Sequence, residues 1–322
     1  MKGIKMNSRV LIFAVFAVTS FSPYSWAKAY GSLDESQAII ADVHMHPHPH
    51  NHPSDVLSWM DRNGVKWAGM GEIKGGRSVR EHYAEVMGDR YINFGGQSQI
   101  NKIYKKYGRE GLEDISNSLF KSLMKELEQD FKSGKLKGIG EVFANARTTS
   151  KPWRGRKMQI DAQTNRTMLD LVAKYGGAMT IHVQWDDDSV LELGRLAEHN
   201  KEGNIIMAHC GSNTFAEDVR SMLAEYSNIY CDLSARHRPK IPDRVIQKRP
   251  HQEIFTSTTL DSSWKRLIED MPDRFMVGTD TKSEWDYDKG IENIRSGLLS
   301  NLSPEAAKKV AYKNAERLLD LQ

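Results

Sequence analysis

The chain has 322 residues, of which 39% are hydrophobic and 27% charged, and its formal net charge is +3. This ordinary apolar content, with aromatic residues spread along the whole chain, excludes an intrinsically disordered protein. The length suffices for one large hydrophobic core, since a single (β/α)8 barrel takes ~250 residues.

The first 27 residues predict a secretory signal peptide. Basic residues up to Arg9 precede the apolar run Val10–Val18, and small residues follow up to Ala27 and Ala29. That order is typical of a cleaved signal, and the run is shorter than the ~20 residues that span a bilayer. We therefore expect cleavage after Ala27 or Ala29, an exported protein (periplasmic or secreted), and no stable membrane anchor.

Cleavage would remove three positive charges and no negative ones, so the net charge of +3 would fall to zero. A neutral mature chain gives no global argument for a nucleic-acid partner. We expect a small-molecule substrate and no nucleic acid, and the sequence leaves the oligomeric state open.

Residues 28–37 are polar and read as a linker, and residues 38–322 as one domain. Within that domain, short apolar runs predict buried parallel strands. These runs are Ala38–Val43, Val65–Met70, Tyr91–Phe94, Leu136–Val142, Ala178–Ile181, Asn204–Ala208, Ile229–Leu233 and Phe275–Gly278. Stretches with helical spacing lie between them: Val56–Arg62, Val79–Met87, Ile115–Phe131, Ala162–Lys174, Val190–His199, Ala216–Glu225, Ser263–Asp270 and Gly290–Leu299. A last helix is expected from Ser303 towards Leu319.

Eight strands that alternate with helices predict an α/β fold, a single (β/α)8 TIM-type barrel. An open doubly wound sheet is the alternative. Against it, the glycine pairs at Gly69–Gly71 and Gly138–Gly140 lack the third glycine of a dinucleotide-binding turn.

Polar residues end several of these strands, and the active site of such a barrel forms at that end. They are His44 and His46 after the first strand, Glu141 after the fourth, His182 and His209 after the fifth and sixth, and Asp280 after the eighth. Each alone has a simpler explanation: a hydrogen-bonded core histidine, a salt-bridge partner for Glu141, a helix cap for Asp280. Their coincidence across five strands favours a site for a divalent metal, most simply Zn²⁺.

Several motifs in the same order resemble the amidohydrolase superfamily. They are Asp42–His46, Gly140–Val142, Ile181–His182, Ala208–Gly211 and Val277–Thr281. Three more are similar to its amidohydrolase-related branch: Tyr230–Ser234, Pro272–Phe275 and Val310–Leu318. The likeness covers roughly residues 38–320 and implies a metal-dependent hydrolase.

The resemblance also implies roles for the strand-end residues. His44, His46 and Asp280 would hold the more buried metal, and His182 and His209 a second metal, or else the substrate if only one ion binds. Glu141 stands where many members carry a carboxylated lysine that bridges two metals, so the number of ions, one or two, stays open. Asp280 would take the proton of the attacking water, and His209 would assist catalysis.

The substrate is expected to be an ester, lactone, amide or phosphoester, and arginines after the strands suit an anionic one. We predict Arg236 and Gln184 as substrate contacts, because both closely follow a strand. His48, His50 and His52 extend the first motif and suggest either an accessory metal-binding loop or a solvated one. Cys210 and Cys231 lie in neighbouring predicted strands; two free buried thiols are favoured over a bridge.

Two other functions remain compatible with the sequence. One is a non-hydrolytic, metal-dependent decarboxylase of the same fold. The other is a non-catalytic exported metal-binding protein in which the histidine-rich loop does the binding, although such a protein would not need Asp280.

Overall fold

The computed structural model describes residues 39–146, 155–237, 252–281 and 283–322. The predicted signal peptide, residues 1–27, and the linker, residues 28–37, lie outside the described residues. All later statements concern the described ranges.

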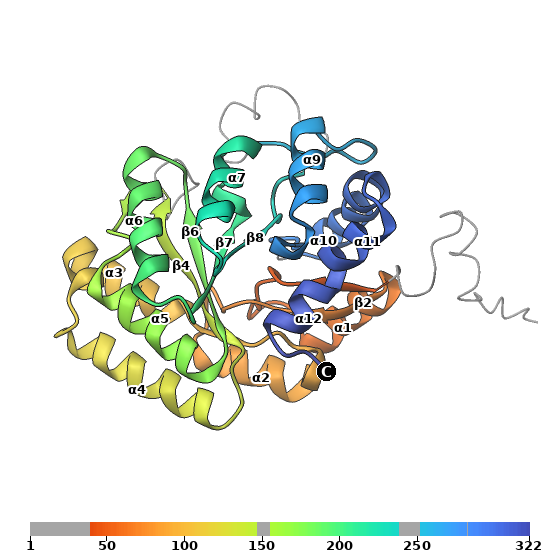
Figure 1. Ribbon diagram of the computed structural model, residues 1–322. Coiled ribbons are helices and arrows are strands. Elements are labelled where there is room, and N and C mark those ends of the chain that lie inside the picture. The colour runs from red at the N-terminus through yellow and green to blue at the C-terminus, as the bar shows by residue number, and fades with distance from the viewer. Residues whose placement is uncertain (1–38, 147–154, 238–251, 282) are drawn as a thin grey trace, which may run out of the picture.

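Eight parallel strands form the centre of the molecule (Figure 1). They are β1 (Ile40–Asp42), β2 (Val65–Ala68), β3 (Phe94–Gly96), β4 (Gly138–Ala146), β6 (Ala178–Val183), β7 (Asn204–Ala208), β8 (Ile229–Asp232) and β9 (Phe275–Met276). A further short strand, β5 (Arg156–Lys157), pairs antiparallel with the end of β4. Each of the eight predicted strands overlaps an observed one, the third only at Phe94, and β5 is an addition.

The strands follow one another in chain order. β1 pairs with β2, and β3, β4, β6, β7, β8 and β9 form one continuous ladder. Backbone hydrogen bonds join the two sheets at both ends: Ile92 donates to Ala68 at 3.0 Å, and Val43 donates to Val277 at 3.1 Å. The strands therefore surround a common interior, as the predicted (β/α)8 barrel requires.

Helices surround these strands on the outside (Figure 1). They are α1 (Pro53–Arg62), α2 (Arg77–Met87), α3 (Gln97–Glu113), α4 (Ser118–Lys132), α5 (Gln163–Tyr175), α6 (Asp187–His199), α7 (Ala216–Glu225), α9 (Ser262–Asp270), α10 (Glu284–Asn293), α11 (Pro304–Lys308) and α12 (Asn314–Leu318). A π-helical segment, Ile294–Leu298, extends α10, and another, Lys309–Lys313, joins α11 to α12.

Helix α9 illustrates how the sequence specifies these elements. Asp261 caps it by accepting hydrogen bonds from the backbone N–H groups of Ser263 and Trp264. Trp264, Leu267 and Ile268 recur at helical spacing and are buried against the barrel. Burial of each such side chain stabilises the fold by about 2 kcal/mol, so packing rather than helix propensity holds α9 in place.

The third β-α unit differs from the sequence expectation. The strand was expected at Tyr91–Phe94, but β3 spans Phe94–Gly96, and helix α3, Gln97–Glu113, was not predicted. Two features weaken its signal: no side chain caps its start, and Gly108 interrupts it with a φ of 68°. Strand residues turn directly into helix at Gly96, where a φ of 94° suits glycine.

Among the described residues, no helix is both long and apolar enough to cross a bilayer. The strand residues are buried, with three exceptions: Lys66 of β2 is exposed, and Asn204 of β7 and Lys157 of β5 are half-buried. Polar side chains that remain inside this interior need partners or a ligand.

Candidate metal centre

The six predicted strand-end residues converge at one end of the barrel. Their ligand atoms form two overlapping groups, in each of which all atoms lie within 4.8 Å of one another. One group is His44, Glu141 and His209, and the other is His44, His46 and Asp280. His182 joins them through Glu141, since its Nδ1 lies 2.8 Å from Glu141 Oε1.

Glu141 lies between two sets of histidines. Its Oε2 is 3.7 Å from Nε2 of His44 and 3.6 Å from Nε2 of His46. Its other oxygen, Oε1, faces His182 at 2.8 Å and Nε2 of His209 at 3.4 Å. The two carboxylate oxygens are thus directed to different pairs of imidazoles, an arrangement able to connect two neighbouring cation positions.

Asp280 completes the first set from the opposite side. Its Oδ1 lies 3.5 Å from Nε2 of His46 and 3.9 Å from Nε2 of His44. The Asp280 side chain is 27% exposed, whereas those of His44 and His46 are at most 1% exposed. Asp280 is therefore the carboxylate of this centre that solvent reaches.

Hydrogen bonds behind the histidines fix their ring orientation. Nδ1 of His44 lies 2.9 Å from Asp232 Oδ2, Nδ1 of His46 lies 2.9 Å from the carbonyl of Gly71, and Nδ1 of His209 lies 2.8 Å from Ser234 Oγ. Each contact leaves the Nε2 atom directed towards the centre. Histidines that bind metals in proteins are held in this way.

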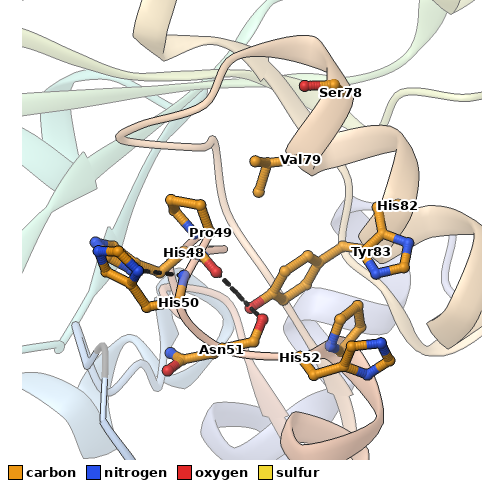
Figure 2. Close-up of a pocket in the computed structure, with 10 residues that line it drawn as sticks. His48, Pro49, His50, Asn51, His52, Ser78, Val79, His82 and Tyr83 are labelled. Atoms are coloured by element: carbon orange, nitrogen blue, oxygen red, sulfur yellow. Dashed lines mark hydrogen bonds between the residues drawn. The ribbon is translucent and has the colours of Figure 1, made fainter.

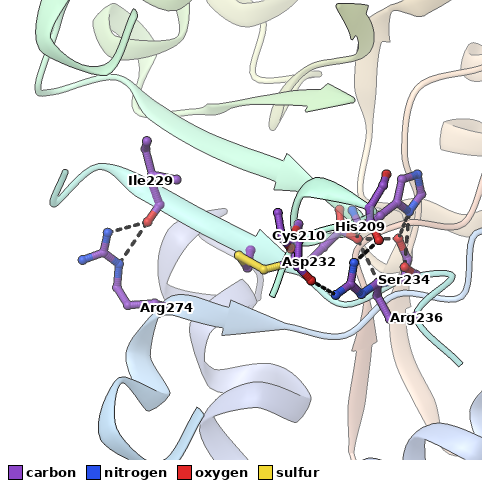
Figure 3. Close-up of a disulfide and its surroundings, with 10 residues drawn as sticks. His209, Cys210, Ile229, Asp232, Ser234, Arg236 and Arg274 are labelled. Atoms are coloured by element: carbon purple, nitrogen blue, oxygen red, sulfur yellow. Dashed lines mark hydrogen bonds between the residues drawn. A yellow bond between two sulfur atoms is a disulfide. The ribbon is translucent and has the colours of Figure 1, made fainter. Parts of the chain in front are cut away.

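Asp232 is the main residue that the search for strand-end ligands missed. Besides His44, it accepts hydrogen bonds from the backbone N–H of His209 at 3.2 Å and from Ser234 (Figure 3). It ends β8, so the rule applied to the other strands would have found it. Its position inside the Tyr230–Ser234 motif was the available signal.

The donor set fits a divalent metal. Nε2 of His44 is fully buried and has no hydrogen-bond partner among the described residues. An imidazole nitrogen in that position would otherwise lose its hydration without compensation. Imidazoles and carboxylates directed at one point are ligands that Zn²⁺ and similar ions prefer.

Burial and neighbouring charges shift the pKa values of the residues in this centre. Burial opposes ionisation of Glu141, but His44, His182 and His209 outweigh it and hold the pKa of Glu141 well below its usual range. Burial likewise disfavours a charged His44, yet Asp232 and Glu141 raise the pKa of His44 well above its usual value. For His182, burial dominates and lowers the pKa.

The same factors act on the exposed carboxylate. Burial would raise the pKa of Asp280, but the hydrogen bond from His46 and the neighbouring histidines hold it well below the usual range. Asp280 is therefore ionised at neutral pH.

The backbone at two of these residues adopts a conformation that non-glycine residues seldom take. His209 has a φ of 53° and Asp280 a φ of 55°. Such conformations cost of order 1–3 kcal/mol and occur often at functional sites. His209 follows β7 directly, and Asp280 lies four residues after β9.

The two cysteines form a disulfide beside the centre (Figure 3). The expectation of two free thiols was therefore wrong. Their Cα atoms are 4.7 Å apart, because β7 and β8 are neighbouring strands. The bridge joins the residue after His209 to the residue before Asp232, and so links two residues that act on the centre.

Arg236 and Gln184 occupy buried positions near the strand ends. The Arg236 guanidinium donates to the backbone carbonyls of Ser212 and Thr214 and lies 4.7 Å from the Trp264 ring. Burial lowers its pKa to about 9. Gln184 is 5% exposed, and its backbone pairs with Asn145. A substrate contact stays a prediction for both, and the carbonyl contacts give Arg236 a structural role.

The histidine-rich run leads away from the six residues. His48, His50 and His52 line a surface cavity of about 360 Å³ together with His82 and Tyr83 (Figure 2). The rings pair as His48 with His50, at 4.9 Å, and His52 with His82, at 5.3 Å. None of the six metal-site residues lines this cavity. The role of the loop stays open.

Comparison with solved structures supports the fold. The chain is similar to an uncharacterized TIM-barrel protein from Bordetella bronchiseptica, with a TM-score of 0.57, 12% identity, and coverage of 88% of this chain and 99% of the other. It is also similar to a dihydroorotase from Campylobacter jejuni, with a TM-score of 0.54, 13% identity, and coverage of 88% and 83%.

A third similar structure is a probable 2-pyrone-4,6-dicarboxylic acid hydrolase from Acinetobacter baumannii with citric acid bound. Its TM-score is 0.53 and its identity 10%, and the match covers 88% of this chain and 99% of the other. At these identities the likeness shows the fold alone. No curated protein matches the chain significantly.

Family models give the more specific result. The model described as "Amidohydrolase" matches residues 118–321, which is more than half of the chain and contains four of the six candidate metal ligands. The shared fold and this match agree with the resemblance drawn from the strand-end motifs. The chain therefore belongs to the amidohydrolase family, as a TIM-barrel member with a cluster of residues able to hold a metal.

Proposed function

We propose that this protein is an exported, metal-dependent hydrolase that uses a metal-activated water to cleave an ester, lactone, amide or phosphoester of a small molecule. One observation carries the proposal: Glu141 places one carboxylate oxygen against His44 and His46 and the other against His182 and His209. Family membership supports an enzyme with a small-molecule substrate.

The proposed ligands divide between two positions that share Glu141. His44, His46 and Asp280 would hold the first ion, and His182 and His209 a second one. Zn²⁺ suits this mixture of imidazole and carboxylate ligands best. The closely spaced group of His44, His46 and Asp280 supports at least the first position.

A divalent metal held by these residues would supply Lewis-acid chemistry, polarising the substrate oxygen and making water a stronger acid, with a pKa of around 7. Side chains of this protein would carry out the proton transfer and orient the reacting groups. Asp280 is ionised and reached by solvent, so its carboxylate accepts the proton of the attacking water and returns it to the leaving group. If only one ion binds, His209, held by Ser234, would instead polarise the carbonyl or orient the water.

Export is proposed from the basic and apolar segment in residues 1–27, followed by the linker 28–37 and the catalytic domain 38–322. The Cys210–Cys231 bridge supports this location, because disulfides persist mainly in oxidising compartments such as the periplasm. Expression with the native leader and fractionation of the cells would show whether the mature chain leaves the cytoplasm.

The catalytic proposal is tested with Asp280→Asn. Zinc-loaded wild type, D280N and the exposed-carboxylate control Asp286→Asn would be assayed on chromogenic lactones, carboxylic esters and phosphoesters, with carbon dioxide release measured in parallel for carboxylic acids. We expect hydrolysis by wild type and D286N and, with the fold retained, a loss of at least 1,000-fold per bound metal in D280N. Activity of metal-loaded D280N would contradict the role of Asp280, and carbon dioxide as the product would contradict hydrolysis.

A further inference from the structure

A buried arginine that forms no salt bridge among the described residues lies beside the candidate metal centre, where the Glu141 carboxylate acts on its pKa only from beyond salt-bridge distance. Arg156, in β5, is fully buried, and no carboxylate lies within 4.0 Å of its guanidinium among the described residues. Burial lowers the pKa of Arg156 to about 10, which still leaves it charged at neutral pH. A buried charge of this kind is costly unless something compensates it.

The partners of Arg156 leave one edge of the guanidinium unused. Nη1 donates to Oδ1 of Asn101 at 2.7 Å. Nε and Nη2 are buried and have no hydrogen-bond partner in the described parts of the chain. These two N–H groups point in parallel from one side of the planar guanidinium, and that edge is the one that binds a carboxylate through two hydrogen bonds.

Aromatic rings hold the guanidinium plane on the side of the metal centre. Its central carbon lies 4.6 Å from the Tyr104 ring and 5.8 Å from the Phe143 ring. Phe143 in turn stacks on His182 at 4.8 Å with an interplanar angle of 19°. The guanidinium carbon of Arg156 therefore lies within about 11 Å of the His182 ring centre, the length of a small bifunctional molecule.

Two amides on α3 add further unsatisfied donors. Asn101 uses its Oδ1 for Arg156, but its Nδ2 has no partner among the described residues, and neither amide atom of the fully buried Gln97 has one. Gln97 and Asn101 are four residues apart and so lie on one face of the helix. Gln97 directly follows β3, at the end of the barrel where substrates bind.

We infer that Arg156, with Asn101 and Gln97, forms a subsite for a substrate carboxylate, so that the substrate is a small organic acid whose cleaved bond lies a few atoms from its carboxylate. This inference rests on the proposed function for the cleaved bond, but the subsite itself does not need the metal. A carboxylate on the Nε and Nη2 edge would neutralise the buried charge and satisfy both donors. Arg156 is then a residue that determines specificity.

Calorimetric titration of the purified holoprotein with glutarate, benzoate and the neutral analogue glutaramide tests the subsite. We expect wild type to bind at least one of the two acids at least tenfold more tightly than glutaramide. Arg156→Gln should lose at least tenfold in affinity for that acid, and Arg156→Lys, which keeps the charge without the parallel donors, an intermediate amount. Arg195→Gln, at an exposed arginine paired with Asp161, is the matched control and should bind as wild type does.

Thermal unfolding and metal content of each sample separate the two proposals. Acid binding that depends on Arg156 in a protein without metal would support the subsite and contradict the metal-dependent hydrolase. A folded, metal-loaded protein that binds neither acid, or folded R156K and R156Q variants that bind as wild type does, would overturn the subsite alone. Tighter Arg156-dependent binding of inorganic phosphate would overturn the assignment to a carboxylate.

Discussion

Asp232→Asn changes the contact that fixes the His44 ring without removing a proposed ligand. The aspartate accepts from Nδ1 of His44 at 2.9 Å and from the backbone of His209 at 3.2 Å, and all three residues are at most 2% exposed. An asparagine is nearly isosteric, but it places an N–H₂ group or a neutral oxygen where His44 needs an anionic acceptor. Since the orientation of His44 would no longer be fixed, the metal should bind more weakly.

Loss of such a carboxylate behind a metal-binding histidine typically costs 10–100-fold in affinity, or about 1.4–2.8 kcal/mol. We expect a zinc affinity lower by that factor in D232N, measured by competition with a chromophoric chelator at pH 7.5. Asp161→Asn removes another buried carboxylate, bound to Arg166 and Arg195 rather than to a histidine, and should leave zinc affinity unchanged. Equal affinities of folded D232N and wild type would refute the reasoning.

The remaining predictions concern stability. Burial raises the pKa of Asp161, but hydrogen bonds from Arg195 and other neighbours lower it below its usual value. The stability that this group adds is present above the unfolded pKa of ~4 and is lost as pH falls through the lower folded pKa. Urea titrations should therefore find D161N less stable than wild type at pH 7, and a smaller difference between the two at pH 3. Replacement of Cys210 and Cys231 by serine opens a loop with a sequence separation of 21. The free energy of unfolding should fall by about 3 kcal/mol, and a free energy unchanged in urea unfolding would count against the bridge. Gly278→Ala would place a Cβ 2.6 Å from the Cβ of His44. This clash should lower the free energy of unfolding by about 1–3 kcal/mol and weaken zinc binding. A variant with the stability and zinc affinity of wild type would contradict the packing around His44.

Much of the fold could be predicted because its signals are local. Each barrel strand is a short run buried on both sides, and helices such as α9 carry their apolar residues at regular spacing. Helix α3 could not be predicted in this way, because a left-handed Gly108 breaks it and its buried face includes the polar Gln97 and Asn101. Those polar residues point to the proposed subsite rather than to the core alone.

The residues of the candidate site could be predicted from the sequence, but the contacts between them could not. Strand-end position is visible in a sequence, and it was enough to name the six residues that the fold brings together. Contacts that depend on the distance between strands are not visible in a sequence, which is why the Cys210–Cys231 bridge was missed. Asp232 was missed although it ends a strand, because the rule was not applied to β8. Arg156 was not singled out from the sequence, since only the structure shows that its Nε and Nη2 have no hydrogen-bond partner among the described residues.

The central claim, that the barrel end holds a divalent metal, is tested most directly by elemental analysis of the purified mature protein and of a His44→Ala/His46→Ala variant. We predict at least one equivalent of a divalent metal, most simply zinc, in the wild type and a loss of at least one equivalent in the folded variant. A wild type without metal, or a variant with unchanged metal content, would contradict the account.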